Sequence, residues 1–136
     1  MRVLIVDDAP LMRERLSRIV KEAVEDCLVT VVGCLEGAMV ALKSGAQYDL
    51  VISDHYLKDP PNPPEGQDVL AMASELSPAP YRILVSKKFI PGWTGYNASF
   101  VHQFISLHYS NETFASDLRT AVINRRPLVL ESESSI

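Results

Sequence analysis

Short apolar runs alternate with segments of helical periodicity along the chain, and this alternation constrains the fold more than any other feature of the sequence. The runs consist almost entirely of apolar residues, which is typical of parallel strands buried on both faces of a sheet. We expect strands at residues 3–6, 28–32, 50–53, 83–85 and 104–107. A sheet of this kind needs helices on both faces, and the intervening segments have to supply them.

The intervening segments place apolar residues three and four positions apart, as on the buried stripe of a helix. Pro10 stands where a helix start tolerates the missing N–H group. Helices are expected from residue 10 to about residue 24, and around residues 38–42, 69–76, 98–103 and 114–122. The alternation predicts an α/β fold with a doubly wound, five-stranded parallel sheet. Its crossovers are right-handed, and ligands bind beyond the carboxyl ends of the strands.

Length and composition indicate one globular domain. The 136 residues are 47% hydrophobic and 22% charged, and we expect a single domain at 1–126 followed by a flexible tail at 127–136. A partner-binding role for this acidic tail is the alternative.

The charge and the cysteines exclude several classes of protein. Thirteen Lys and Arg against 17 Asp and Glu give a net charge of −4, which argues against a nucleic-acid partner. No apolar run approaches the length of a membrane span, so no membrane association is expected. Cys27 and Cys34 lack CxxC spacing and fit neither a zinc site nor a disulfide framework. We expect free thiols in a reducing, cytoplasmic environment.

Four polar residues follow the predicted strands. Asp7 and Asp8 come after the first strand, Asp54 after the third and Ser86 after the fourth. In a doubly wound sheet the first and third strands are neighbours, so these side chains gather at one edge. Crowded carboxylates repel one another unless a cation lies among them, and Mg²⁺ binds through a few such oxygens. A carboxylate beside Mg²⁺ can also attack phosphorus and form an aspartyl phosphate.

Helix capping is the alternative explanation for these aspartates. Asp is a preferred N-cap residue after a strand, and for Asp8 alone capping is favoured over metal binding. For the whole set, however, capping would require three acids and a hydroxyl to fall on neighbouring strand ends by accident.

Two segments resemble a known family. Residues 1–15, MRVLIVDDAPLMRER, are similar to the opening of a response-regulator receiver domain, and YDLVISD at 48–54 resembles the third strand of that family with its terminal phospho-acceptor. The resemblance covers roughly residues 1–125. It implies a flavodoxin-like (βα)5 architecture with strand order 2-1-3-4-5.

The resemblance also implies roles for particular residues. Asp54 would be the phospho-acceptor, and Mg²⁺ would be held by Asp7, Asp8, Asp54 and the backbone carbonyl of Tyr56. Ser86 stands at the position of the switch hydroxyl. Phe104 stands at the position of the switch aromatic, with plain core packing as the alternative.

The sequence departs from the family pattern after strand five. Leu107 and His108 stand where the family has a lysine and a proline, so the usual cation for the phosphoryl group is missing. We hypothesise that Lys87, beside Ser86, replaces it, while a solvated loop lysine is the alternative.

Two loops also depart from the pattern. The Pro-rich loop at 59–64 delays the helix that begins at Gly66 and could restrict access or present a docking surface. Trp93, Tyr96 and Phe100 add aromatic area that fits either an interface or local packing. His55, His102 and His108 show no spacing of metal ligands.

Three functions compete. The first is a cytoplasmic single-domain response regulator, a monomer or weak homodimer, phosphorylated on Asp54 by a histidine kinase or a histidine phosphotransfer protein. Its output would be protein contacts at the face formed by the expected helix at 98–103, the strand at 104–107 and the helix at 114–122. Its chemistry would be limited to Mg²⁺-dependent self-phosphorylation and slow self-dephosphorylation. The second is a pseudo-receiver that works without phosphorylation. A small phosphohydrolase is the third, but the chain offers no general acid or glycine-rich phosphate loop.

Overall fold

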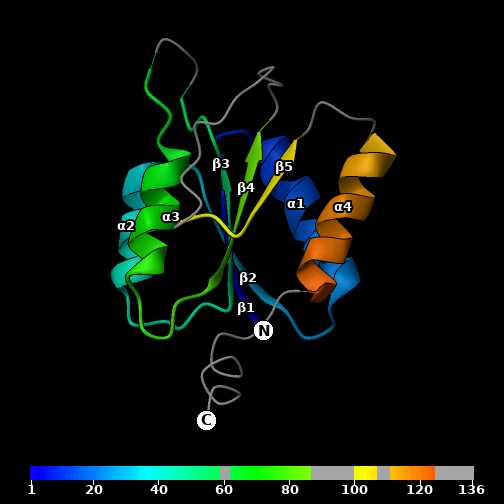
Figure 1. The fold of residues 1–136 in the computed structure, drawn as a ribbon, viewed down its shortest axis with the longest axis horizontal. Coiled ribbons are helices and arrows are strands. Elements are labelled where there is room, and N and C mark those ends of the chain that lie inside the picture. Colours follow the sequence, from blue (N-terminus) through cyan, green and yellow to red (C-terminus); the bar gives the residue numbers. More distant parts are fainter. Residues whose placement is uncertain (59–61, 87–99, 107–110, 125–136) are drawn as a thin grey trace.

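A five-stranded, all-parallel sheet forms the centre of the molecule. The structure is a computed structural model that describes residues 1–58, 62–86, 100–106 and 111–124. The strands are β1 (Arg2–Val6), β2 (Leu28–Val32), β3 (Leu50–Asp54), β4 (Tyr81–Ser86) and β5 (Gln103–Ser106). They lie in the order β2-β1-β3-β4-β5, with β1 between β2 and β3 (Figure 1). This arrangement confirms the predicted sheet and its order.

Four helices within the described residues cover the two faces of the sheet. They are α1 (Pro10–Ala23), α2 (Leu35–Lys43), α3 (Gly66–Ser74) and α4 (Asn111–Asn124). Helices α1 and α4 lie side by side on one face, and α2 and α3 cover the other (Figure 1). None of the described helices is long and apolar enough to cross a membrane.

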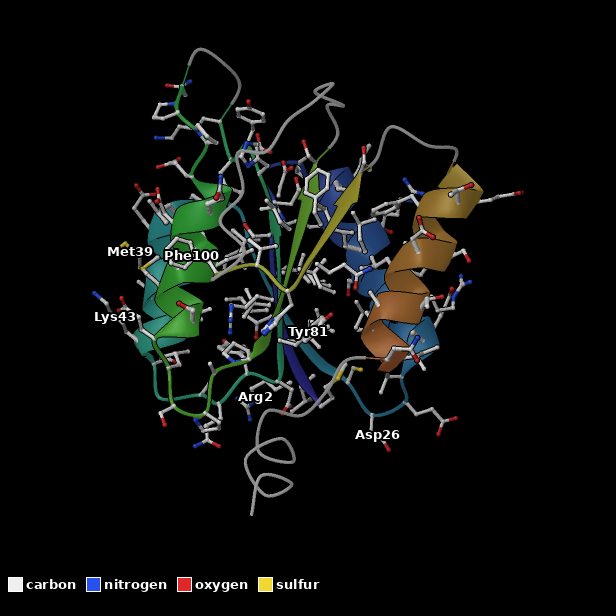
Figure 2. All side chains as sticks on the ribbon, viewed as in Figure 1. Arg2, Asp26, Met39, Lys43, Tyr81 and Phe100 are labelled. Atoms are coloured by element: carbon white, nitrogen blue, oxygen red, sulfur yellow. The ribbon has the colours of Figure 1, made fainter. Side chains whose placement is uncertain are left out.

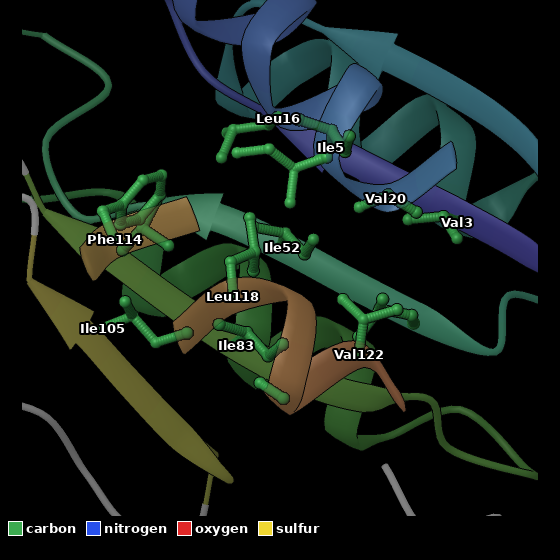
Figure 3. Close-up of a cluster of buried hydrophobic side chains, with 14 residues drawn as sticks. Val3, Ile5, Leu16, Val20, Ile52, Ile83, Ile105, Phe114, Leu118 and Val122 are labelled. Carbon is green, nitrogen blue, oxygen red and sulfur yellow. The ribbon is translucent and has the colours of Figure 1, made fainter. Parts of the chain in front are cut away.

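Each face of the sheet carries its own hydrophobic core. Figure 3 shows the core under α1 and α4, where Ile5 and Ile52 of the sheet meet Leu16 of α1 and Leu118 of α4. The other core lies under α2 and α3 and includes Leu70. All five residues of β3 are buried, as the unbroken apolar run predicts. Burial on both faces is typical of an interior strand, and β3 lies between β1 and β4. The residue at its carboxyl end, Asp54, therefore lies next to the ends of these two strands.

The segment before β5 corrects one prediction. A helix near 98–103 is wrong for the part that the structure describes, because residues 100–102 are not helical and Gln103 begins β5. Arg82 of β4 holds this segment: its Nε donates to the carbonyl of Phe100 at 2.6 Å, and its own carbonyl accepts from the N–H of His102 at 2.9 Å. Backbone groups bonded to a neighbouring strand are not available for helical bonds. Residues 98–99 lie outside the described part.

The ends of several strands differ slightly from the predictions. Strand β4 begins at Tyr81, before the apolar run, and β1 begins at Arg2. Figure 2 shows Arg2 and Tyr81 toward the same end of the sheet, where β1 and β4 start. The last helix is confirmed and ends at Asn124, whereas the tail at 127–136 lies outside the described residues.

Candidate functional site

The topology brings three carboxylates together at the carboxyl end of the sheet. Asp7 follows β1, Asp8 comes next, and Asp54 ends β3, the neighbour of β1. One carboxylate oxygen from each lies within 4.8 Å of those of the other two. Asp7 and Asp54 are buried, with 0% and 4% of their surface exposed, while Asp8 is exposed. Two carboxylates of the cluster are therefore buried in the protein, and the third is accessible to solvent.

Asp7 is held by its neighbours. Its N–H donates to the carbonyl of Val32 in β2 at 3.1 Å, which extends the β1–β2 ladder beyond β1. Its Oδ1 accepts from the N–H of Ala9 at 2.9 Å. This bond closes an Asx-turn, in which an aspartate side chain accepts from the backbone N–H two residues later. These two bonds fix both the main chain and the side chain of Asp7.

Helix capping does not account for Asp8. The N-cap of α1 is Ala9, no side chain caps this helix, and Pro10 is its first residue. Proline in this position starts the helix without an N–H group that would need a partner. The capping alternative is therefore wrong for Asp8.

Asp54 is placed by strand register and by a close approach of α3. It pairs with Val85 of β4 in the parallel ladder, and its carbonyl oxygen accepts from the hydroxyl of Ser53 at 3.1 Å. A Cβ on Gly66, the first residue of α3, would collide with that carbonyl oxygen, so only glycine fits there. The N–H of Gly66 also donates to the carbonyl of His55 at 3.0 Å.

The other predicted site residues within the described part lie at or near the same edge. Ser86 ends β4 one position beyond the partner of Asp54 and is 2% exposed. Phe104 is half-buried in β5 and packs against the core under α2 and α3. Tyr56 follows Asp54 by two residues, and its ring meets that of His55 edge to face at 4.5 Å. Lys87, Leu107 and His108 lie outside the described residues.

His55 has an environment that the sequence did not indicate. Its side chain is 2% exposed, although it follows the candidate acceptor directly. Burial lowers the pKa of His55 below its ordinary value of 6.5, because it removes the water that would solvate the charged imidazolium. The side chain is therefore neutral near pH 7. Of the other two histidines, only His102 is described, and its Nδ1 accepts from the N–H of Arg82 at 2.9 Å.

The donor set of the cluster suits a hard divalent cation. Mg²⁺ favours oxygen ligands and retains several waters, which the exposed side at Asp8 can admit. Three carboxylates at this separation repel one another, and a divalent charge among them removes that repulsion. These residues therefore fit Mg²⁺, with Asp7, Asp8 and Asp54 as the side chains that would hold it.

Sequence reasoning missed two residues that shape the site. Arg13 donates from Nη1 to the carbonyl of Asp7 at 2.8 Å, and Gly66 makes room for the carbonyl of Asp54. The position of Arg13 one turn into α1 could have indicated this contact. Side chains in the first turns of a helix point toward its N-terminus, which here follows the end of β1.

Known structures share this fold. No family model and no curated protein matches the chain. A signal receiver domain of two-component signal transduction from Clostridium thermocellum superposes with a TM-score of 0.70 at 20% identity, over 91% of this chain and 98% of that one. The chemotaxis response regulator CheY4 of Vibrio cholerae has a TM-score of 0.62 at 19% identity, over 88% of this chain and 96% of that one. A response regulator receiver protein from Sinorhizobium medicae has a TM-score of 0.61 at 23% identity, over 90% of this chain and 96% of that one. The chain has the fold of response-regulator receiver domains.

Proposed function

We propose that the chain is a receiver domain that accepts a phosphoryl group on Asp54 and signals through protein contacts that depend on this group. One observation carries the proposal: Asp54 is almost fully buried, yet its carboxylate lies within 4.8 Å of those of Asp7 and Asp8. Ser86, at the end of the next strand, adds a hydroxyl to the same edge. The receiver fold supports the same function.

The reaction needs little from the protein beyond placement. A carboxylate oxygen of Asp54 attacks the phosphorus of the donor, and a new P–O bond forms as the bond from phosphorus to the donor atom breaks. The electron pair of the broken bond leaves with the donor, the imidazole in the case of a phosphohistidine. The hydroxyl of Ser86 donates a hydrogen bond to a phosphoryl oxygen. Asp7, Asp8, Asp54 and the Tyr56 carbonyl would hold Mg²⁺, which would neutralise negative charge on the transferred group.

The partners follow from this chemistry. The donor is a histidine kinase or a histidine phosphotransfer protein, as the resemblance implies. The output is a protein that contacts the face around β5 and α4 after Ser86 and Phe104 respond to the phosphoryl group. Beyond self-phosphorylation from a small donor and slow self-dephosphorylation, we propose no enzymatic activity. The protein would work in the cytoplasm as a monomer or weak homodimer.

Phosphorylation can be tested by mass spectrometry of the intact chain. After incubation with acetyl phosphate and Mg²⁺, we expect one added phosphoryl group in the wild type and none in Asp54→Asn. Asp68→Asn is the matched control, because it removes an exposed carboxylate from the first turn of α3 and should still be phosphorylated. Equal labelling of Asp54→Asn and wild type would refute the assignment.

A pseudo-receiver is the second candidate, and Leu107 in the position of the family's lysine favours it. Without a cation there, a phosphoryl group of about −2 charge loses a charge-assisted bond. A wild-type chain that neither binds Mg²⁺ nor takes up phosphate would support this candidate. The Lys87 hypothesis adds a further arm: Lys87→Ala should slow the uptake of phosphate, and labelling at the parental rate would reject Lys87 as the substitute cation.

A further inference from the structure

We propose that Arg13 is a positioning residue that holds Asp7 in place for divalent-cation binding. The inference rests on the Mg²⁺ site of the proposed function and assigns a role to a residue outside the carboxylate cluster. Arg13 lies in the first turns of α1, and its Nη1 donates to the carbonyl of Asp7 at 2.8 Å in a partly buried contact.

The bond from Arg13 completes the anchoring of Asp7. The N–H of Asp7 is bonded to β2 through Val32, and its Oδ1 is bonded to the N–H of Ala9. Arg13 adds a bond to the carbonyl, so each backbone polar group of Asp7 has a partner on a different element. Metal ligands depend on such supporting bonds, because a main chain that can shift carries the carboxylate out of position for the ion.

Gly33 leaves the space that this contact requires. A Cβ at Gly33, just after β2, would lie 2.8 Å from Nη1 of Arg13 and 3.9 Å from the carbonyl oxygen of Asp7. The first distance is closer than real Cβ contacts allow. The clashing atom is the far end of a flexible side chain, so a Cβ at Gly33 would displace the guanidinium rather than the backbone. The guanidinium therefore occupies a place kept open by a residue on another element.

An electrostatic role and a positioning role of Arg13 predict opposite changes in Mg²⁺ affinity when the side chain is removed. A cation near three carboxylates competes with Mg²⁺, so a purely electrostatic role means that its removal strengthens Mg²⁺ binding. A positioning role means that its removal weakens Mg²⁺ binding, because Asp7 is held less firmly. The sign of the change separates the two roles.

The test is calorimetric titration of the full chain with Mg²⁺. We expect Arg13→Met to raise the Kd about tenfold, the scale seen when a supporting partner of a metal ligand is removed. Gly33→Ala, which displaces the guanidinium and keeps its charge, should raise the Kd in the same direction. Arg18→Met is the matched control: it removes a cation from the same helix that pairs with Glu14 at 3.2 Å on the surface, and it should leave the Kd unchanged.

Thermal unfolding supplies a second readout. A merely structural Arg13 would lower the Tm of the metal-free chain and leave the rise in Tm caused by Mg²⁺ intact, whereas a positioning residue diminishes that rise. An Arg13→Met chain with wild-type or tighter Kd would overturn the inference alone. A wild-type chain that binds no Mg²⁺ would instead overturn the proposed function.

Discussion

Asp7 and Asp54 are carboxylates buried at the ends of strands that are otherwise apolar. Burying a charge costs free energy unless it is paired, and Asp7 and Asp54 lie close to each other and to Asp8. Three hydrogen bonds, one to each backbone polar group and one to Oδ1, hold Asp7, and its carboxylate lies close to two others. Repulsion among the three carboxylates opposes folding when no cation is bound.

The first prediction concerns this cost. In the absence of divalent cations, Asp54→Asn should raise the free energy of unfolding by about 1 kcal/mol, because it removes one of three repelling charges and keeps the shape of the side chain. Urea unfolding in the presence of a chelator measures the difference. Asp68→Asn, on the surface of α3, should change it by less than about 0.5 kcal/mol. A less stable Asp54→Asn chain would show that its carboxylate is favourably paired.

The second prediction concerns pH. Burial lowers the pKa of His55 in the folded chain, so below about pH 6.5 the unfolded chain binds a proton that the folded chain resists. Stability contributed by neutral His55 is therefore present above that pH and is lost as the pH falls toward the lowered pKa. His55→Leu should show a smaller loss of unfolding free energy between pH 7.5 and 5. An unchanged pH slope would contradict the prediction.

Strand β4 shows why the sequence misplaces the limits of elements. Arg82 lies in the ladder of β4 and is 7% exposed, although a charged residue argues against a buried strand. Its Nη1 donates to the carbonyl of Pro80 at 2.8 Å and its Nε to that of Phe100. The ring of Tyr81 stacks on that of His102 at 4.5 Å, which holds the start of β5 against β4. Pro80 is a local partner, but Phe100 and His102 are distant along the chain, so hydropathy could not reveal their contacts with β4.

Helix α4 supplies the third prediction. Leu118 is fully buried among side chains of the sheet and of α1 (Figure 3). Leu118→Ala should lower the free energy of unfolding by about 2–5 kcal/mol, because it removes buried methyl groups and leaves a cavity. The control is Leu11→Ala on α1, whose side chain is 82% exposed and should matter by less than about 0.5 kcal/mol. Denaturant titration compares the two, and equal effects would contradict the packing of α4.

The order of the strands assembles the site. Because β1 lies between β2 and β3, the chain that leaves β1 meets the end of β3 on one side and the segment after β2 on the other. Asp54 therefore meets Asp7 and Asp8 from the β3 side. Gly33 and Arg13 meet Asp7 from the β2 side. A different order of the same strands would separate these groups.

The fourth prediction links metal binding to the stability of the whole molecule. A ligand that binds only the folded chain stabilises it by mass action, by about 2.7 kcal/mol at 100 times its Kd. Mg²⁺ at that excess should therefore raise the Tm by several degrees, and a chelator should reverse the rise. Asp8→Asn removes the exposed ligand and should diminish the effect. A Tm that does not respond to Mg²⁺ would contradict the site.

The apolar runs alone determined the sheet, the buried interiors of β1, β3 and β4, and the aspartates at the strand ends, because burial on both faces demands an unbroken apolar run that stops where polar residues begin. The edge strand β2 is largely exposed although its run is also mostly apolar, so its burial was decided by its place in the sheet. The resemblance added the strand order, and the structure confirms it. Only the tertiary structure decided what surrounds the aspartates. Arg13, Gly33 and Gly66 are separate from the aspartates in the sequence and lie beside their backbone only after the strands and helices have packed. Contacts of this kind depend on distances in space, which local patterns of polarity do not encode.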